Sequence, residues 1–567
     1  MKNILILLLV IITLGKSVLS QPKNNLNYRS PLEIPLIFAA NFGELRSNHF
    51  HMGVDYKTKH VEGMKIFSVQ DGYVSRIKVS SYGYGKVIYI NHPEGVTSVY
   101  AHCSIFKGEI DSIVKVHQHL KESFEIDIKL NNDEIKVEKG QVIALSGNTG
   151  GSTAPHLHFE LRDTETETAL NPLKYGYEIK DSKSPKLSHL KIYSLTKEGY
   201  VTTDNNFKYK LSLINNQYIP EQKTIYIPVN YITKNGGLGF SFDAYDPYDL
   251  SYNKLGIYGS KLLINNELIF ETKIDSISFD HTRYINTYTD FHEFSVNRRN
   301  YHKSFKNLNN PLTVYNSKKD GIIKIKQGDT LNIDFKIFDT KNNNSNLSFK
   351  LIVTQANNTN YFLKDFSNDK FINTNKPYDF FSKDSIIRIK TEENTFYEPI
   401  SLMIKEKNSS NDFTFGEKTT PIHKYIHIDI DLNKLNSSLV FNKCYLTVNN
   451  RYLETVITDG LLRSKSKYLG GFKLETDTLS PIIRQKNFSN SNVSTYNKIR
   501  WEIVDTKSGI QDYDLYIDDK WQVLEYEYKN NTVTFVIPRN LKGQKEVKVV
   551  VKDNCNNTKI WKKNLTF

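Results

Sequence analysis

Histidines stand near acidic or glycine-rich neighbours at three places in the first 160 residues of the chain. The three segments are His51-Met-Gly-Val-Asp55, Tyr100-Ala-His102 and Pro155-His156-Leu-His158-Phe-Glu160. Imidazole and carboxylate groups are the ligands of catalytic zinc, which takes three protein ligands and leaves one position open. Three ligands from this set would leave two histidines for proton transfer and for stabilising an oxyanion. The residue types therefore indicate metal-assisted hydrolysis.

The elements around these residues must bring them together. Side chains alternate faces along a strand, so His156 and His158 would share one face and Leu157 would lie on the other. A glycine-rich segment, Ser146 to Ala154, directly precedes this pair. Gly53 permits a tight turn between His51 and Asp55. We therefore expect strands and short loops to converge on one site.

Each motif is weak when it is taken alone. His117-Gln-His119 is a second His-x-His, in a polar stretch, and we interpret it as surface residues. Separate, structurally satisfied histidines are the more common explanation of a single motif. The three motifs in this order, with the glycine-rich loop before the pair, favour a metal site instead.

At this point the sequence resembles a known family. The segments HMGVD, VYAH and GNTGGSTAPHLHFELRD are similar to the three signatures of the lysostaphin/LytM-type zinc metallopeptidases, which are peptidoglycan endopeptidases. DGYV and YGYGKVIYINHPEG resemble the strands between those signatures. The resemblance covers roughly residues 30–180, which is under a third of the chain.

Carried over residue by residue, the resemblance implies zinc ligands and catalytic histidines. His51, Asp55 and His158 would bind zinc, and His102 and His156 would lie beside the attacking water. The implied fold is a small antiparallel β-sheet with a groove across it. The implied substrates are peptides of the bacterial cell wall.

Two neighbouring residues leave alternatives open. Glu160 would share the face of His156, where it could orient a ligand, or it could be a plain surface carboxylate. Cys103 follows His102, where relatives often carry an apolar residue. Because adjacent strand residues face opposite ways, a buried core residue is favoured over a nucleophile at Cys103.

Composition indicates a mainly β protein of several domains. Tyr, Phe and β-branched residues are plentiful, and Asn, Asp and Gly turns separate short alternating runs. Two segments repeat one pattern: Gly256-Ile257 followed by Leu262 to Asn266, and Gly509-Ile510 followed by Leu515 to Asp519. We expect strand–turn hairpins of immunoglobulin-like β-sandwiches there. The predicted parts are a signal peptide (1–20), a zinc metallopeptidase domain (21–180, with an inserted hairpin or mixed excursion at about 107–139), an Ig-like domain with an insertion (187–357), a β-rich domain (378–475) and a second Ig-like domain (478–567).

The N-terminal segment of the chain indicates its location. A basic start, an apolar run from Ile4 to Leu14 and small residues up to Ser20 are typical of a cleaved secretory signal. No later stretch is apolar enough to span a membrane. We expect an exported protein of the periplasm, the cell envelope or the medium. Three cysteines cannot form a disulfide framework, although Cys444 could pair with Cys555.

The function expected from the sequence is zinc-dependent hydrolysis of peptidoglycan peptide cross-links. The net charge of +13 comes from scattered lysines, and nucleic-acid-binding motifs are absent, so we expect no nucleic-acid partner. The C-terminal β domains would place the enzyme at the envelope or bind a protein partner there. Two alternatives are an inactive scaffold or regulator that keeps the fold, and an endopeptidase with a protein substrate.

Overall fold

The computed structural model describes residues 28–567 except 178, 317–319, 369, 410 and 436–438. The predicted signal peptide lies outside the described residues. Strands make up most of the regular structure, which confirms the predicted mainly β fold class. Among the described residues, no helix has the length and apolarity to cross a membrane.

The first unit, β1 to β13, is an antiparallel sheet that carries all the predicted site residues. Its main path runs β1-β4-β12-β8-β7-β6-β10, and β11 joins both β5 and β8. Buried Leu157 and Phe159 pack beneath the sheet with Tyr56 and Tyr100. The elements are β1 (Phe38–Ala40), β2 (Leu45–Arg46), β3 (His49–Phe50), β4 (Val54–Lys57), β5 (Lys65–Phe67), β6 (Gly72–Val79), β7 (Lys86–Asn91), β8 (Val96–Phe106), α1 (Glu109–Lys121), β9 (Ile126–Lys129), β10 (Lys136–Val137), β11 (Val142–Ser146), β12 (His156–Asp163) and β13 (Ala169–Leu170).

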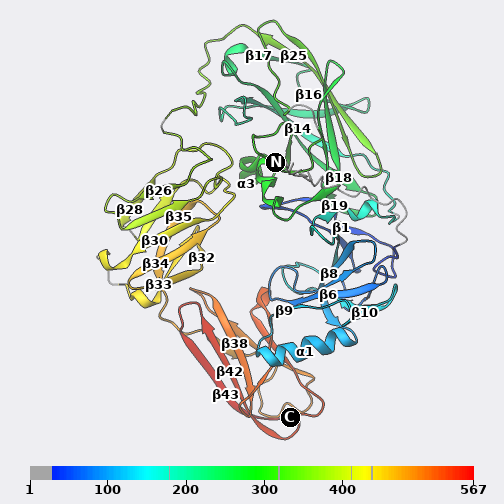
Figure 1. Ribbon diagram of the computed structural model, residues 1–567, viewed down its shortest axis with the longest axis vertical. Helices are drawn as coiled ribbons and strands as arrows, with labels where there is room; N and C mark the ends of the chain where they lie inside the picture. Colours follow the sequence, from blue (N-terminus) through cyan, green and yellow to red (C-terminus); the bar gives the residue numbers. More distant parts are fainter. Residues whose placement is uncertain (1–27, 178, 317–319, 369, 410, 436–438) are drawn as a thin grey trace, which may run out of the picture.

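The polar segment at 107–139 is a mixed excursion rather than a simple hairpin. It begins with helix α1 and returns through β9 and β10, which both pair with β6. Ile110 and Val114 lie four residues apart on the buried face of α1. The excursion therefore extends the first sheet and covers its edge with a helix (Figure 1).

The second unit, β14 to β25, is built on an 11-stranded sheet and packs against the first unit. Its path is β19-β18-β14-β15-β16-β25-β24-β20-β21. Ile274, Ile277 and Tyr288 belong to this unit but are buried in the core of the first. The elements are β14 (Lys186–Leu195), β15 (Phe207–Ile214), β16 (Gln217–Pro220), β17 (Thr224–Pro228), β18 (Gly237–Tyr248), β19 (Ser251–Leu255), β20 (Gly259–Ile264), β21 (Glu267–Lys273), β22 (Ser276–Ile277), α2 (Ile285–Tyr288), α3 (Phe291–Asn297), β23 (Tyr301–Lys303), β24 (Thr330–Phe338) and β25 (Asn344–Thr354).

The third unit, β26 to β35, packs two five-stranded sheets face to face. Ile428 from one sheet and Phe472 from the other share a core. Its strands are β26 (Tyr378–Phe381), β27 (Ile387–Thr391), β28 (Ile404–Ser409), β29 (Asp412–Phe415), β30 (Ile426–Asp431), β31 (Cys444–Val448), β32 (Arg451–Leu453), β33 (Thr455–Thr458), β34 (Leu461–Ser466) and β35 (Gly470–Thr476).

The fourth unit, β36 to β43, packs two four-stranded sheets around Trp501. Its strands are β36 (Ile482–Gln485), β37 (Lys498–Val504), β38 (Ile510–Ile517), β39 (Lys520–Gln522), β40 (Glu525–Glu527), β41 (Thr532–Val536), β42 (Gln544–Asp553) and β43 (Thr558–Thr566). We propose that the four units are the separate domains expected from the sequence.

Both repeated segments form the predicted hairpins. β20 and β21 meet at Asn265-Asn266, and β38 and β39 meet at Asp518-Asp519. All four turn residues have positive φ, which matches the type I′ turns that suit two-residue hairpins.

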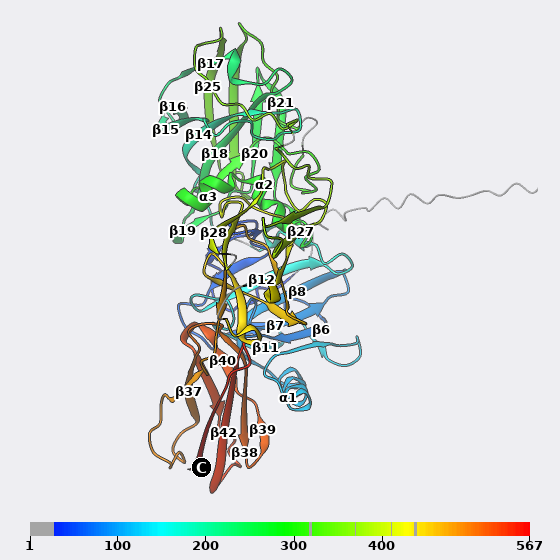
Figure 2. The same ribbon diagram turned by 90° about the vertical axis from the view of Figure 1, so that its left-hand side faces the viewer.

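The units follow one another around a ring that closes on itself (Figures 1 and 2). The third unit returns to the second, where the hydroxyl of Tyr397 donates to the carbonyl of Arg283 at 2.7 Å. The fourth unit returns to the first, where Lys86 Nζ lies 2.9 Å from Glu525 Oε1. The C-terminal unit, far away in sequence, therefore lies beside the N-terminal sheet.

Candidate metal centre and its histidines

Two neighbouring strands align the predicted metal ligands. In the antiparallel pair of β4 and β12, His158 lies opposite Asp55 and His156 lies opposite Lys57. His51 comes from the loop between β3 and β4, four residues before Asp55. This register brings residues about a hundred positions apart to the same face of the sheet.

The donor atoms of His51, Asp55 and His158 converge. His51 Nε2 lies 3.0 Å from both Asp55 Oδ1 and His158 Nδ1. His158 Nδ1 lies 2.9 Å from Asp55 Oδ1. All three residues are buried. The structure therefore places together the three residues that the sequence predicted as ligands.

The chemistry of these donors fits zinc. Two imidazole nitrogens and one carboxylate oxygen form a recognised catalytic ligand set. Donors about 2.0–2.1 Å from a tetrahedral zinc would lie roughly 3.3 Å apart, close to the separations found here. The Nδ1–H of His51 donates to the carbonyl of Asn41 at 2.7 Å, which turns Nε2 toward the other donors.

The charges of the centre are fixed by its surroundings. Burial opposes ionisation of Asp55, but His51 and hydrogen bonds from His156 and His158 outweigh it and hold the pKa of Asp55 well below its usual range. Arg46 Nη2 donates to the second oxygen, Oδ2, of Asp55 at 3.1 Å. Asp55 is thus a carboxylate with one oxygen held by Arg46 and the other directed at the histidines.

Behind His158 lies a buried chain of polar groups. His158 Nε2 is 2.8 Å from Glu160 Oε1, and the Nε–H of Arg162 donates to Glu160 Oε2 at 2.7 Å. The hydroxyl of Tyr84 also donates to Glu160 Oε1. Glu160 is fully buried, so the surface-carboxylate alternative is wrong. Ligand-orienting carboxylates of this kind fix the ring and the tautomer of a metal-binding histidine.

These contacts also set two pKa values. Burial alone would lower the pKa of His158, but hydrogen bonds to Asp55 and Glu160 raise it to about 9. Burial would raise the pKa of Glu160, but Arg162 and His158 lower it to about 2. Glu160 is therefore ionised at neutral pH. His158 must give up its proton before a metal can bind Nδ1.

His102 lies beside the donors in a strained backbone conformation. Its φ of 60° is in the left-handed region, which non-glycine residues rarely adopt. Its Nδ1–H donates to the carbonyl of Thr149 at 2.8 Å. Burial and the neighbouring His158 and His156 lower the pKa of His102 to about 3. The ring is therefore neutral, with a lone pair on Nε2.

His156 presents the same nitrogen to the centre. Its Nδ1–H donates to the carbonyl of Ala154 at 2.8 Å, and its Nε2 is 3.4 Å from Asp55 Oδ1. The ring centroids of His102 and His156 are 4.8 Å apart. Two histidines outside the donor triad thus flank it, each held through a carbonyl of the segment at 146–154.

That segment, the glycine-rich loop, is held by close backbone packing. A Cβ on Gly85 would lie 2.4 Å from Thr149 Oγ1, and one on Gly150 would lie 2.4 Å from the Gly85 nitrogen. Gly151 N also donates to the carbonyl of Gly83 at 2.7 Å. The glycines therefore let two loops touch directly under the histidines.

The fourth unit supplies a lysine to the same loop. Lys529 Nζ donates to the carbonyls of Asn148, Gly150 and Ser152 at 2.5, 3.1 and 3.0 Å. These carbonyls lie in the same segment as the Thr149 and Ala154 carbonyls that hold the two flanking histidines. Sequence reasoning missed Lys529, as it missed Arg46 and Tyr84, because no local pattern marks any of them.

The remaining candidates lie away from the chemistry. Cys103 is fully buried, and burial raises the pKa of its thiol to about 12, which confirms the core residue. Cys444 and Cys555 are also buried and free. His117 and His119 lie on α1, apart from the donors.

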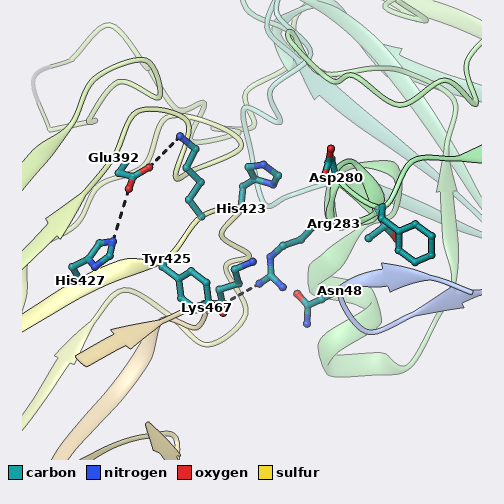
Figure 3. A pocket seen from close by; sticks show the side chains of 11 residues that line it. Asn48, Asp280, Arg283, Glu392, His423, Tyr425, His427 and Lys467 are labelled. Carbon is teal, nitrogen blue, oxygen red and sulfur yellow. Dashed lines mark hydrogen bonds and ion pairs between the residues drawn. The ribbon is translucent and has the colours of Figure 1, made fainter. Parts of the chain in front are cut away.

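A cavity of about 610 Å³ lies apart from the centre, between the first three units. Arg283 and Lys467 line it beside His423, and Glu392 pairs with Lys424 and His427 on one side of it (Figure 3). Among its lining residues are none of the three donors or the two flanking histidines.

Comparisons with known sequences find a family match within the first unit. The profile of Peptidase family M23 matches residues 49–126 and 125–172. An uncharacterized metalloprotease of Haemophilus influenzae is 33% identical over 123 residues, 22% of this chain and 20% of that protein. The DD-carboxypeptidase/endopeptidase Mpg of Neisseria meningitidis serogroup B is 31% identical over 118 residues, 21% of each chain. The chain thus spans about a fifth of the length of these relatives.

Solved structures match a similar share of the chain. The catalytic domain of the M23 protein EnpA from Enterococcus faecalis is 26% identical and covers 25% of this chain and 93% of that chain, with a TM-score of 0.19. The catalytic domain of lysostaphin from Staphylococcus simulans is 25% identical and covers 25% of this chain and 91% of that chain, also with a TM-score of 0.19. The sequence matches, rather than these scores, identify the first unit.

Proposed function

We propose that this chain, whose residues 49–172 form a domain of the Peptidase family M23 type, is an exported zinc-dependent endopeptidase that hydrolyses peptide cross-links of bacterial peptidoglycan. One observation carries the proposal: three zinc-type donors converge, and the rings of two further histidines, His102 and His156, lie beside them. The similarity to a DD-carboxypeptidase/endopeptidase supports the substrate class.

In this proposal the zinc ligands are His51 Nε2, Asp55 Oδ1 and His158 Nδ1. Zinc bound there would lower the pKa of water toward about 7 and polarise the scissile carbonyl. Glu160 and Asn41 hold the two imidazole rings in the orientation that binding needs. Arg46 holds the second oxygen of Asp55 away from the donors.

His102 and His156 act as the catalytic histidines of the proposal. With Nδ1–H bonded to the Thr149 carbonyl, the neutral ring of His102 offers a lone pair at Nε2, and the ring of His156 is likewise held through Nδ1 by the Ala154 carbonyl. One ring can therefore accept the proton of the attacking water and later pass it to the leaving amine. The other ring, when protonated, can donate from Nε2 to the oxyanion of the tetrahedral intermediate.

The proposed location and partners are inferred from the proposed substrate. A cell-wall peptide is met in the periplasm, in the envelope or outside the cell, where the predicted signal would deliver the chain. We propose that the third and fourth units position the enzyme at the envelope or bind a protein partner there.

The test is mass spectrometry of purified peptidoglycan after incubation with the zinc-loaded mature protein. We expect loss of cross-linked muropeptides and the appearance of their monomers, abolished by a chelator and restored by added zinc. The matched control is Asp55→Asn, which retains the shape of the side chain but removes the charge that binds zinc.

Other outcomes would change the assignment. Unchanged muropeptides with zinc bound to a folded chain would contradict the proposed substrate and favour a protein substrate or a scaffold. Cleavage that persists in Asp55→Asn would contradict the proposed centre.

A further inference from the structure

Three carboxylates gather at the junction between the first and second units, and none of them belongs to the proposed zinc centre. Asp181 lies in the segment before β14, Asp246 lies in β18, and Asp339 directly follows β24. Each contributes an oxygen, and the three oxygens lie within 4.8 Å of one another. Asp246 and Asp339 are buried, whereas Asp181 is half-buried and opens the cluster to solvent.

Asp246 is the member of this cluster that the protein leaves unsatisfied. Its side chain is only 3% exposed, and its Oδ1 is buried without a hydrogen-bond partner among the described residues. Asp339 differs, because its Oδ1 accepts from the backbone nitrogens of Lys341 and Asn343. A buried carboxylate oxygen with no donor is costly, so it points to a group absent from the polypeptide.

The charges at the junction also favour the binding of a cation by the cluster. Lys183 Nζ lies 3.9 Å from Asp249 Oδ1 instead of pairing within the cluster. Burial, together with the charges of Asp181 and Asp339, raises the pKa of Asp246 to about 9. Three neighbouring carboxylates without a cation would repel one another strongly in this buried setting.

A second cluster in the chain supplies a natural comparison. Asp477 precedes the fourth unit and gathers with Asp505 and Asp553 of that unit, and their oxygens also lie within 4.8 Å of one another. The preceding segments share one pattern, Asp181-Ser-Lys-Ser-Pro185 and Asp477-Thr-Leu-Ser-Pro481. The central aspartate of each cluster, Asp246 or Asp505, occupies the same place relative to the proline. Asp246 follows Tyr245, which pairs with Lys186 just after Pro185. Asp505 follows Val504, which pairs with Ile482 just after Pro481.

The hydrogen bonds of the two clusters also correspond, except at the central aspartate. Asn343 Nδ2 donates to Asp339 Oδ2 and to the Asp181 carbonyl, and Asn557 Nδ2 donates to Asp553 Oδ2 and to the Asp477 carbonyl. Asp505, however, accepts from the backbone nitrogens of Lys507 and Gly509. The second cluster is therefore satisfied by the chain, and only the first has an unsatisfied oxygen.

We propose that Asp181, Asp246 and Asp339 bind a calcium ion at the junction of the first and second units. The donors are carboxylate oxygens alone, which suit a hard cation and disfavour zinc or copper. Carboxylates on separate elements and an open side for water match the flexible coordination of Ca²⁺ by six to eight oxygens. The ion would tie the linker at Asp181 to β18 and to the loop after β24.

The proposal does not depend on the peptidase activity, and its test measures calcium directly. Calorimetric titration of CaCl₂ into the zinc-loaded full chain, freed of other divalent ions, should show binding with a Kd of about 10⁻⁴–10⁻³ M, as in extracellular calcium modules. Bound calcium should also raise the Tm of the chain. Asp246→Asn should abolish both the binding event and this rise in Tm. The matched control Asp505→Asn should retain both, with the zinc content unchanged in all three proteins.

The same titration can overturn the proposal. Absence of calcium binding to the folded wild-type chain at about 10 mM CaCl₂, above the range of such modules, would contradict it. Binding that survives in Asp246→Asn would contradict it as well, since it would place the ion elsewhere. Asp181→Asn is a second variant, at a half-buried position, should Asp246→Asn fail to fold.

Discussion

His158 is held through both ring nitrogens, since Nδ1 faces the donor cluster and Nε2 faces Glu160. We expect His158→Ala to lose nearly all bound zinc, because two remaining ligands make too weak a site. Metal analysis of the purified, folded variant measures this. His117→Ala removes a histidine of the other His-x-His motif, on α1, and should keep its zinc. Near-stoichiometric zinc in His158→Ala would refute the ligand assignment.

A variant of His102 would test metal binding and turnover separately. Its Nδ1 is bonded to the Thr149 carbonyl, and its lowered pKa, about 3, keeps the ring neutral above that pH. We expect His102→Ala to keep zinc and to lose about 10²- to 10⁴-fold in kcat, the usual contribution of a positioned general base or acid. Parallel assays of zinc content and muropeptide release give the answer. Unchanged turnover would remove His102 from the mechanism.

At the scale of the element, strand β12 carries on one face a proposed zinc ligand, a proposed catalytic histidine and the carboxylate that contacts the ligand. His156, His158 and Glu160 alternate with buried Leu157 and Phe159. We expect Glu160→Gln to weaken zinc affinity about 10- to 100-fold, because it removes the charge that orients His158 and raises its basicity. Competition with a chromophoric chelator measures the affinity, and Glu167→Gln, an exposed carboxylate near the same strand end, serves as control. Equal affinities in both variants would mean that Glu160 has no orienting role.

The same strand shows why part of the site was predictable. Alternation along His156 to Glu160 is a local property, so sequence parity placed these side chains on one face correctly. The burial of Glu160 was not predictable, because Tyr84 and Arg162 cover it through the sheet pairing. Helix α1 was also missed: its buried Ile110 and Val114 are too few to stand out among polar neighbours.

Across the whole molecule, the ring places the end of the chain against the site at its beginning. The ring centroids of Tyr82 and Tyr528 lie 4.5 Å apart, and Lys86 pairs with Glu525. Lys529 bonds to a loop 377 to 381 residues away in sequence. Contacts at that separation leave no local pattern, so the sequence could suggest a positioning role for the C-terminal units only in general terms.

Lys529 allows a test of whether the contact between the fourth and first units affects turnover. Its ammonium group bonds to three carbonyls of the segment that also holds His102 and His156, so its loss should loosen both rings without touching the proposed zinc ligands. We expect Lys529→Ala to lower kcat by up to about 100-fold with little change in KM, because small misplacements of catalytic groups have effects of that size. Steady-state kinetics on a soluble muropeptide dimer separate the two constants. Lys520→Ala, an exposed lysine of the same unit, should behave as wild type. A higher kcat in Lys529→Ala would show that the closed ring restrains the enzyme, and an unchanged kcat would show that the closure serves stability alone.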